Sequence, residues 1–163
     1  METKSLTFLL TLTFLFMFSG SSVVFGDDLQ DGLGAWFEKD YDTAYKLLAP
    51  LAEQGDSYAQ RFLGANYYLG LGVTQDYAEA AKWYKKAAEQ EDRIAQNILG
   101  AMYAKGKGVS KDFVEAYKWF SLSEETVNGR MYKEKIGKRK MTSAQIAKAQ
   151  KLVQEWMVKY QKK

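Results

Sequence analysis

Apolar residues recur along this chain at intervals of three and four, the spacing that gathers side chains on one face of an α-helix. Two segments carry the same stripe, made of Ala44, Leu47, Leu48 and Leu51 in the first and of Ala80, Trp83, Tyr84 and Ala87 in the second. Each is followed by a segment with small and apolar residues at Ala59, Leu63, Gly64 and Tyr67, and again at Ala95, Leu99, Gly100 and Tyr103. The pattern predicts four helices in two pairs.

These pairs belong to an internal repeat. Residues 40–75 laid over residues 76–111 without a gap are identical at 17 of 36 positions, and a third copy starts in register at Asp112 and fades after Leu122. Sequence periods of this length indicate stacked supersecondary units that bury their apolar faces against one another. We therefore predict an all-α fold, an α-solenoid of stacked antiparallel helix pairs.

Aspartates mark where the predicted helices begin. Asp40, Asp76 and Asp112 precede the first helix of each copy, and Asp56 and Asp92 precede the second. A carboxylate at this position accepts an unpaired backbone N–H of the first turn. The repeat therefore predicts the starts of five helices.

The ends of the helices are marked by glycine. The first helix of copy one should end at Gly55, where glycine can adopt the left-handed C-cap conformation without strain. The second copy has Glu91 there, and we expect it either to adopt that conformation at a cost of about 1 kcal/mol or to shift the cap. The Gly-x-Gly pairs at 70–72 and 106–108 are interpreted as C-cap and turn, because the remaining residues of a phosphate-binding loop are missing.

Two further predictions concern helix interiors. Gly64 and Gly100 would each cost about 1 kcal/mol relative to alanine, so their recurrence suggests close approach by a neighbouring backbone. Pro50 removes a backbone hydrogen bond and is expected to kink its helix, at a cost of roughly 3 kcal/mol unless the bend is accommodated.

The N-terminal segment has the profile of a signal peptide. Residues 5–26 carry no charge, follow Lys4 and contain the apolar run 6–18. Val24 and Gly26 suit a cleavage site, so we expect a cut after Gly26 and a periplasmic or secreted protein. The alternative is an uncleaved anchor, since the whole uncharged stretch could span a bilayer.

Composition removes several kinds of chemistry. The chain has neither cysteine nor histidine, which excludes disulfides, thiolate nucleophiles, the commonest general base and the usual zinc and copper ligands. We therefore expect no catalytic residue, no metal and no cofactor.

Charge is divided unevenly along the chain. Residues 27–129 contain 11 Lys and Arg against 17 Asp and Glu, a net −6, whereas residues 130–163 contain 11 against 2, a net +9. This basic block either lies partly against the acidic body and is otherwise solvated, or attracts an anionic partner or envelope surface. Nucleic acid is not expected as a partner of an exported chain, and membrane contact is expected only in transit through the signal peptide.

Three motifs carry a family resemblance. They are Ala-x-Lys-Trp-Tyr-x-Lys-Ala-Ala-Glu-Gln from residue 80, Ala-Gln-x-x-Leu-Gly-x-x-Tyr from residue 95 and Gly-x-Gly-Val-x-x-Asp from residue 106. They closely resemble the Sel-one-like repeat, a relative of the tetratricopeptide repeat. The resemblance implies a right-handed superhelix, of a kind common in bacterial envelopes, whose first helices line a concave protein-binding surface. Some cysteine-rich relatives bind or hydrolyse β-lactams, but their paired cysteines are absent here and that activity is not carried over.

The resemblance also divides the chain. It implies a signal peptide at 1–26, an N-terminal capping helix at 27–39, repeats at 40–75 and 76–111, a partial repeat at 112–140 and a C-terminal capping helix at 141–163. Thr142 and Gln145 are spaced as a capping box at the start of the last helix. That helix is expected to cover the apolar face that a terminal repeat would otherwise expose.

Candidate binding residues lie beside the apolar stripes. The aromatic residues of the helices are interpreted as core, because they share their stripes with small alanines: Trp36, Tyr67, Trp83, Tyr84, Tyr103, Trp119, Phe120 and Trp156. Positions that flank a stripe face the groove of a solenoid, and the candidates are Tyr45, Lys46, Ala81, Lys82, Lys85, Tyr117 and Lys118. Lys46, Lys82 and Lys118 recur once per repeat, with Lys85 nearby, and could hold an acidic segment. Alternatively, these lysines are solvated or pair with Glu79 and Glu115.

Together these observations predict a non-catalytic scaffold or adaptor of the bacterial cell envelope that binds a segment of another protein in its concave groove. Two other functions stay open. One is a cell-wall or β-lactam hydrolase that relies on serine, lysine or carboxylate chemistry alone. The other is a module that binds anionic surfaces through residues 130–163.

Overall fold

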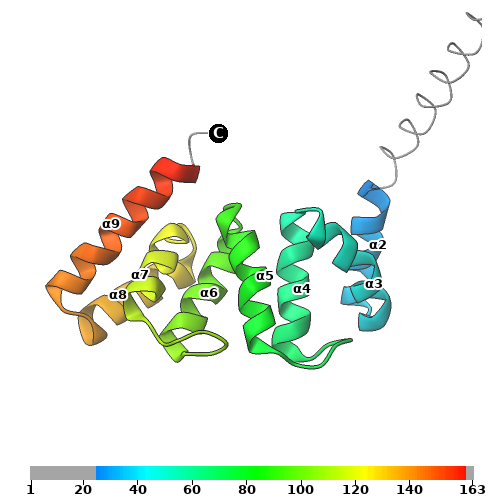
Figure 1. Ribbon diagram of the computed structural model, residues 1–163, viewed down its shortest axis with the longest axis horizontal. Helices are drawn as coiled ribbons and strands as arrows, with labels where there is room; N and C mark the ends of the chain where they lie inside the picture. Colours follow the sequence, from blue (N-terminus) through cyan, green and yellow to red (C-terminus); the bar gives the residue numbers. More distant parts are fainter. Residues whose placement is uncertain (1–24, 161–163) are drawn as a thin grey trace, which may run out of the picture.

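The protein is a single curved row of antiparallel helices (Figure 1). The computed structural model describes residues 25–160, and this part of the chain contains eight helices joined by turns. They are α2 (Phe25–Phe37), α3 (Tyr41–Glu53), α4 (Ser57–Leu69), α5 (Tyr77–Glu89), α6 (Arg93–Lys105), α7 (Phe113–Leu122), α8 (Val127–Lys140) and α9 (Ser143–Tyr160). The predicted all-α solenoid is confirmed.

All five predicted aspartate caps are present. The side chains of Asp40, Asp56 and Asp92 accept the backbone N–H three residues on, at 3.2, 2.7 and 2.8 Å. Asp76 and Asp112 each accept two backbone N–H groups at the start of α5 and α7. Helices α3 to α7 thus begin where a carboxylate satisfies backbone donors that have no partner within the helix.

The predicted left-handed positions are also present. Gly55 has a φ of 105° and Glu91 a φ of 67°, so the glutamate adopts the strained conformation instead of shifting the cap. Gly70 and Gly106 are left-handed C-caps of α4 and α6, with φ of 71° and 69°. In the turn after α6, a Cβ atom on Gly108 would collide with the backbone carbonyl of Tyr77.

The reason for the two glycines inside helices differs from the prediction. A Cβ atom on Gly64 would lie 3.0 Å from the ring of Tyr84, and one on Gly100 would lie 3.0 Å from the ring of Phe120. The groups that approach them are therefore aromatic side chains from the following helix, and the expected close approach of a neighbouring backbone is wrong. Pro50 lies near the end of α3, which continues to Glu53; the kink itself stays a prediction.

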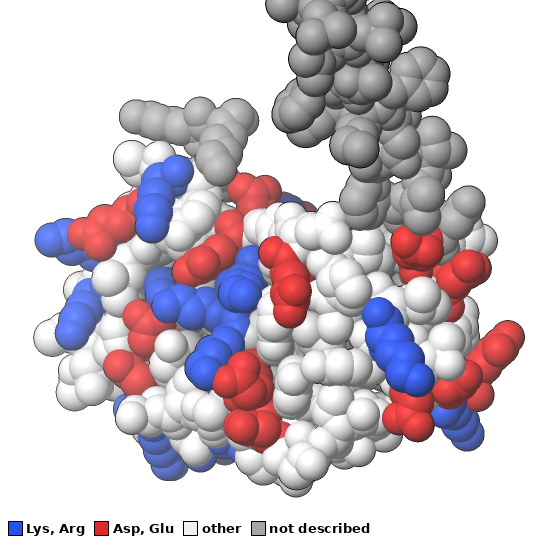
Figure 2. All heavy atoms as spheres, turned by 45° about the vertical axis from the view of Figure 1, so that its right-hand side comes forward, with Lys and Arg blue, Asp and Glu red and all other residues white. Residues whose placement is uncertain are grey.

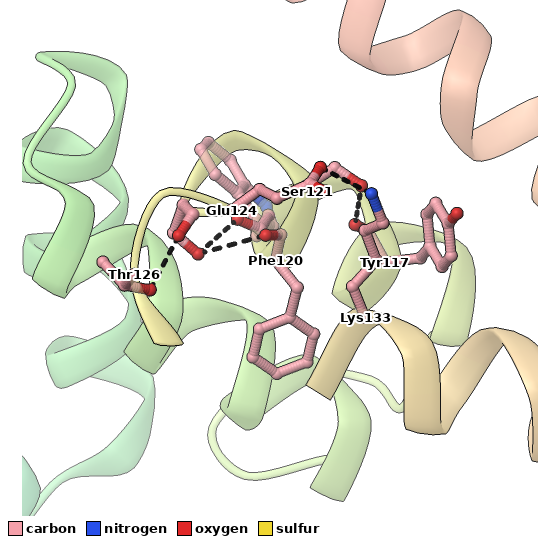
Figure 3. Close-up of polar contacts among 8 residues, drawn as sticks. Tyr117, Phe120, Ser121, Glu124, Thr126 and Lys133 are labelled. Atoms are coloured by element: carbon pink, nitrogen blue, oxygen red, sulfur yellow. Dashed lines mark hydrogen bonds and ion pairs between the residues drawn. The ribbon is translucent and has the colours of Figure 1, made fainter. Parts of the chain in front are cut away.

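The third copy continues further than its sequence pattern. Helix α8 follows α7 in the place of a second helix, although residue 128 is asparagine where the earlier copies have Asp56 and Asp92. Thr126 caps α8 instead, since its hydroxyl accepts the N–H of Gly129 at 2.9 Å. The same hydroxyl donates to the carbonyl of Ser123 at 2.7 Å (Figure 3). A local cap thus replaces the one that the repeat has lost.

The last helix lies against α7. Ala149, Val153 and Trp156 of α9 are buried, and Trp156 shares a hydrophobic cluster with Tyr84 and Trp119. The capping box at its start is confirmed, since the N–H of Thr142 donates to Oε1 of Gln145 at 2.8 Å and the N–H of Gln145 to Oγ1 of Thr142 at 3.3 Å.

The predicted signal peptide lies almost wholly outside the described residues. Helix α2 starts at Phe25, so the predicted cut after Gly26 falls within its first turn. Between Phe25 and Tyr160, no helix combines the length and the apolar character needed to cross a membrane.

Candidate partner-binding groove

A groove of about 310 Å³ lies between α5, α7 and α9. Its apolar lining comes from Tyr103, Trp119, Leu152, Trp156 and Tyr160, and its charged lining from Lys85, Glu89, Glu115, Lys118, Glu155 and Lys159. Figure 2 shows basic and acidic side chains side by side on the face of the protein that it presents. The groove therefore combines an aromatic base with a rim of both charges.

The α7 side of the groove is held in place by Lys118. Its Nζ atom lies 2.5 Å from Oε2 of Glu115 and 4.4 Å from the ring centroid of Trp119. The side chain of Lys118 is 13% exposed, so this ammonium group is fixed by an ion pair and by an aromatic face. Lys118 contributes more to the wall of the groove than to its accessible rim.

The α5 side is more accessible. Nζ of Lys85 lies 4.0 Å from Oε1 of Glu89, and the side chain of Lys85 is 55% exposed. Lys82, one turn earlier, pairs with Glu79 and is 66% exposed. The hydrogen bond that Lys82 donates to Glu79 raises the pKa of Lys82. Exposed pairs of this kind contribute little to stability, so neither lysine is prevented from exchanging its partner.

The α9 side supplies aromatic surface. The rings of Trp156 and Tyr160 stack with centroids 4.9 Å apart, and Nζ of Lys159 lies 4.8 Å from the centroid of Tyr160. A hydrogen bond with Tyr160 raises the pKa of Lys159, which keeps this lysine charged. The groove thus depends on the docking of α9 beside the repeat helices.

The structure separates the seven candidate residues into four groups. Lys85 and Lys118 line the groove, while Lys46 and Lys82 are exposed on α3 and α5. Tyr45 is half-buried. Ala81 and Tyr117 are 5% and 8% exposed and belong to the core.

The expectation that Ala81 and Tyr117 face an open groove is therefore wrong. Ala81 belongs to the cluster around Tyr84. Tyr117 packs with Val114 and Ala149, because α8 and α9 cover the side of α7 on which it lies. Whether the exposed candidates bind a partner stays a prediction.

The hydroxyl groups of Tyr45 and Tyr67 lie 3.2 Å apart, linking α3 to α4. This hydrogen bond, followed by burial, raises the pKa of Tyr67 to about 12. The hydroxyl of Tyr45 is therefore engaged within the protein, and whether Tyr45 binds a partner stays a prediction.

Four of the eight aromatic residues that we interpreted as core are confirmed as buried, and the other four are half-buried. Tyr84, Trp119, Phe120 and Trp156 are buried. Burial raises the pKa of the Tyr84 phenol far above its usual range. Trp83 is only half-buried, and Nζ of Lys86 lies 3.8 Å from its ring centroid.

The structural roles of Gln60 and Gln96 were not predicted from the sequence. Nε2 of Gln60 donates to the carbonyl of Ala52 at 3.0 Å, and Nε2 of Gln96 does the same to Ala88 at 3.1 Å. The recurring Ala-Gln pair was the signal, since both glutamines are buried and bridge the two helices of a pair. In the third copy Tyr132 takes this position, and its ring stacks on Phe120 at 5.3 Å.

The described helices bring no metal-binding group together: within residues 25–160 there is no cluster of three or more His, Cys, Asp or Glu side chains that could hold an ion.

Comparison with known proteins identifies the repeats. The family model of the Sel1 repeat matches residues 29–56, 57–92 and 93–125. None of the curated proteins with which the sequence was compared is similar to it.

Solved structures give the same result. The chain is 31% identical to c5321, a protective antigen of uropathogenic Escherichia coli strains that displays an SLR fold, with a TM-score of 0.77 over 83% of this chain and 30% of that one. It is 35% identical to a Sel1 repeat protein of Oxalobacter formigenes, with a TM-score of 0.63 over 66% of this chain and 45% of that one. Cysteine rich protein B of Helicobacter pylori shares the fold at 23% identity, with a TM-score of 0.54 over 70% of this chain and 99% of that one. The chain thus spans less than half the length of the first two.

Proposed function

Because the chain belongs to the Sel1 repeat family, we propose that it is a non-catalytic adaptor that binds a segment of another protein in the groove between α5, α7 and α9. Sel1 repeat proteins generally mediate protein–protein interactions and are typically non-catalytic scaffolds. The solved relatives named above are bacterial. The groove is the part of this chain that fits such a role best.

One observation carries the proposal: the aromatic base of the groove is surrounded by charged groups of both signs. Binding interfaces typically place aromatic anchors at their centre and polar groups at their rim. The half-buried Tyr103 and Tyr160 provide accessible aromatic surface. Lys85 and Lys159 provide ammonium groups that an acidic partner side chain could reach. A partner segment with both apolar and acidic residues suits this surface.

We further propose that the protein acts in the bacterial envelope, either in the periplasm or after secretion. The support is the uncharged stretch at 5–26 behind Lys4. N-terminal sequencing of exported protein should begin at Asp27, whereas an intact Met1 would contradict cleavage.

The groove can be tested with a photo-activated cross-linker placed at residue 85 and, as a control, at the exposed Lys148 on α9. Irradiation of envelope extract should give a specific adduct from position 85 and none from position 148. Lys159→Gln, combined with the cross-linker at residue 85, should weaken that adduct without changing the circular-dichroism melting curve, because the Lys159 side chain lines the groove and is exposed. Equal adducts from both positions would contradict the proposal.

Two assays address the other candidate functions. Sustained turnover of nitrocefin or peptidoglycan by the purified chain would favour a hydrolase. Sedimentation with anionic vesicles that depends on residues 130–163 would favour a surface-binding module.

A further inference from the structure

The first and second repeats differ at a position that determines the space between each repeat and the next. Tyr68 on α4 and Ala104 on α6 occupy equivalent positions, 36 residues apart. The ring of Tyr68 packs edge-on against two rings of the next helix, 5.2 Å from Tyr77 and 6.4 Å from Tyr84. Ala104 provides no ring at the corresponding place.

A pocket of about 330 Å³ lies where that ring is missing. Phe113 and Phe120, the equivalents of Tyr77 and Tyr84, line it together with Ala101, Ala104, Tyr132 and Ile136. Figure 3 shows the ring of Phe120 pointing away from the hydrogen-bonded turn between α7 and α8. We call this space the anchor pocket.

The rest of the lining is basic. Lys105 at the end of α6 and Lys135, Arg139 and Lys140 on α8 complete the anchor pocket, and none of its lining residues is acidic. Among the described residues, these four cations form no ion pair. The position equivalent to Lys135 is Leu99 in copy two, so this charge is specific to the third repeat.

We propose that the anchor pocket binds one aromatic side chain of a partner protein, presented by a segment that is acidic on either side of it. The size of the occupant follows from the repeat, because a tyrosine of this chain fills the equivalent space one unit earlier. The charge of the occupant follows from the four cations around the opening, which favour carboxylates by electrostatic complementarity. An aromatic side chain is also the group that most often anchors a protein interface.

The anchor pocket is separate from the groove. The two share no lining residue, since the pocket lies between α6, α7 and α8. The proposal therefore does not depend on the function proposed for the groove.

The test uses a dye-labelled peptide with one tyrosine between glutamates, and fluorescence anisotropy with the full chain. The wild type should bind it, with affinity falling as salt is added. Ala104→Tyr should fill the pocket and weaken binding at least about tenfold, as should Lys135→Gln combined with Arg139→Gln. Peptides with alanine for tyrosine, or with glutamine for glutamate, should show the same loss.

Matched controls separate pocket occupation from other effects. Ala147→Tyr puts an aromatic residue on an exposed site of α9, and Lys138→Gln removes an exposed charge from α8 that does not line the pocket. Both should bind like the wild type, and so should the groove variant Lys159→Gln.

Three results would overturn the proposal: no binding by the wild type, binding unchanged in Ala104→Tyr, or binding of oleate in place of the peptide. If Ala104→Tyr does not fold, the double variant Lys135→Gln with Arg139→Gln tests the proposal. Both side chains are exposed, so their replacement should leave the fold intact.

Discussion

Nε of Arg61 lies 2.8 Å from Oδ2 of Asp92, while Oδ1 of the same carboxylate accepts the N–H of Ala95 at 2.8 Å. One carboxylate therefore caps α6 and ties it to α4. The two side chains are 17% and 10% exposed, so removal of one partner leaves the other poorly solvated.

Arg61→Met should accordingly lower the free energy of unfolding by about 2 kcal/mol, because it leaves the carboxylate without its charged partner. Asp92→Asn should lose the ion pair but keep a good N-cap, so its effect should not exceed that of Arg61→Met. Urea unfolding followed by circular dichroism measures both.

The control is Lys138→Gln, which removes an exposed pair with Glu134 whose side chains are 78% and 56% exposed. It should change stability by less than about 0.5 kcal/mol. A similar value for Arg61→Met would mean that the pair between α4 and α6 is no stronger than a surface pair.

A second prediction concerns Glu91, which is left-handed where copy one has Gly55. Glu91→Gly removes a backbone strain of about 1 kcal/mol, part of which is offset by the greater freedom of glycine in the unfolded chain. We expect a gain of about 0.5 kcal/mol and a higher melting temperature. The reverse exchange, Gly55→Glu, should lower it; changes of the same sign in both variants would contradict this account.

These two predictions show what the sequence could and could not specify. The left-handed conformation of Glu91 was one of two outcomes expected from the sequence. It could be foreseen because a helix end is a local feature, set by a few neighbouring residues. The contact between Arg61 and Asp92 joins residues 31 positions apart, and it required the arrangement of two repeats in space. The aspartate caps were predictable because they are local features as well. The solenoid was predictable because the sequence repeats with a period of 36 residues.

The candidate site was only partly predictable for a related reason. Lys85 and Lys118 line the groove, but only Lys118 belongs to the series of Lys46, Lys82 and Lys118 that follows from the repeat period. Tyr117 was placed wrongly, since its burial depends on α8 and α9, which lie beyond the recognisable repeats. A Cβ atom on Gly137 of α8 would lie 3.1 Å from the Tyr117 ring, and nothing in the period indicates that contact.

A third prediction distinguishes two glycines within helices. Gly100→Ala would place a methyl group 3.0 Å from the ring of Phe120, which is 1% exposed and has little room to move. The crowding should outweigh the better helix propensity of alanine and lower stability by about 1 kcal/mol.

Gly34→Ala is the matched control, because no atom lies within 4 Å of the added Cβ. It should raise stability by about 1 kcal/mol through helix propensity alone. Thermal unfolding of the two variants should therefore shift in opposite directions, and stabilisation by Gly100→Ala would show that Phe120 yields readily.

A fourth prediction follows from the raised pKa of Tyr67, which is about 12 in the folded chain and near 10 in an unfolded one. The fold favours the protonated phenol, so this contribution to stability is fully present below pH 10 and is lost as the pH rises from about 10 to 12. Tyr45→Phe removes the hydrogen bond that is the main cause.

The pKa of Tyr67 should therefore fall towards its ordinary value in Tyr45→Phe, as measured by a pH titration of the tyrosine carbon resonances. Tyr58→Phe changes a tyrosine that is 57% exposed and should leave the pKa of Tyr67 unchanged. An unaltered value in Tyr45→Phe would assign the shift to burial.

The last prediction concerns the ring of Tyr68, which is present where α4 packs on α5 and is missing at the equivalent place, Ala104, where α6 packs on α7. Tyr68→Ala should open at the first junction a space like the one beside Ala104, because the ring contacts Tyr77 and Tyr84 and Nζ of Lys107 lies 4.5 Å from its centroid. Loss of a half-buried aromatic side chain with a cavity left behind should cost about 2 kcal/mol.

Tyr58→Ala removes an exposed tyrosine from the same helix and should cost less than about 0.5 kcal/mol. Urea unfolding compares the two. A small effect of Tyr68→Ala would mean that the helices can close over the vacated space, and the open pocket beside Ala104 would then need a cause other than its missing ring.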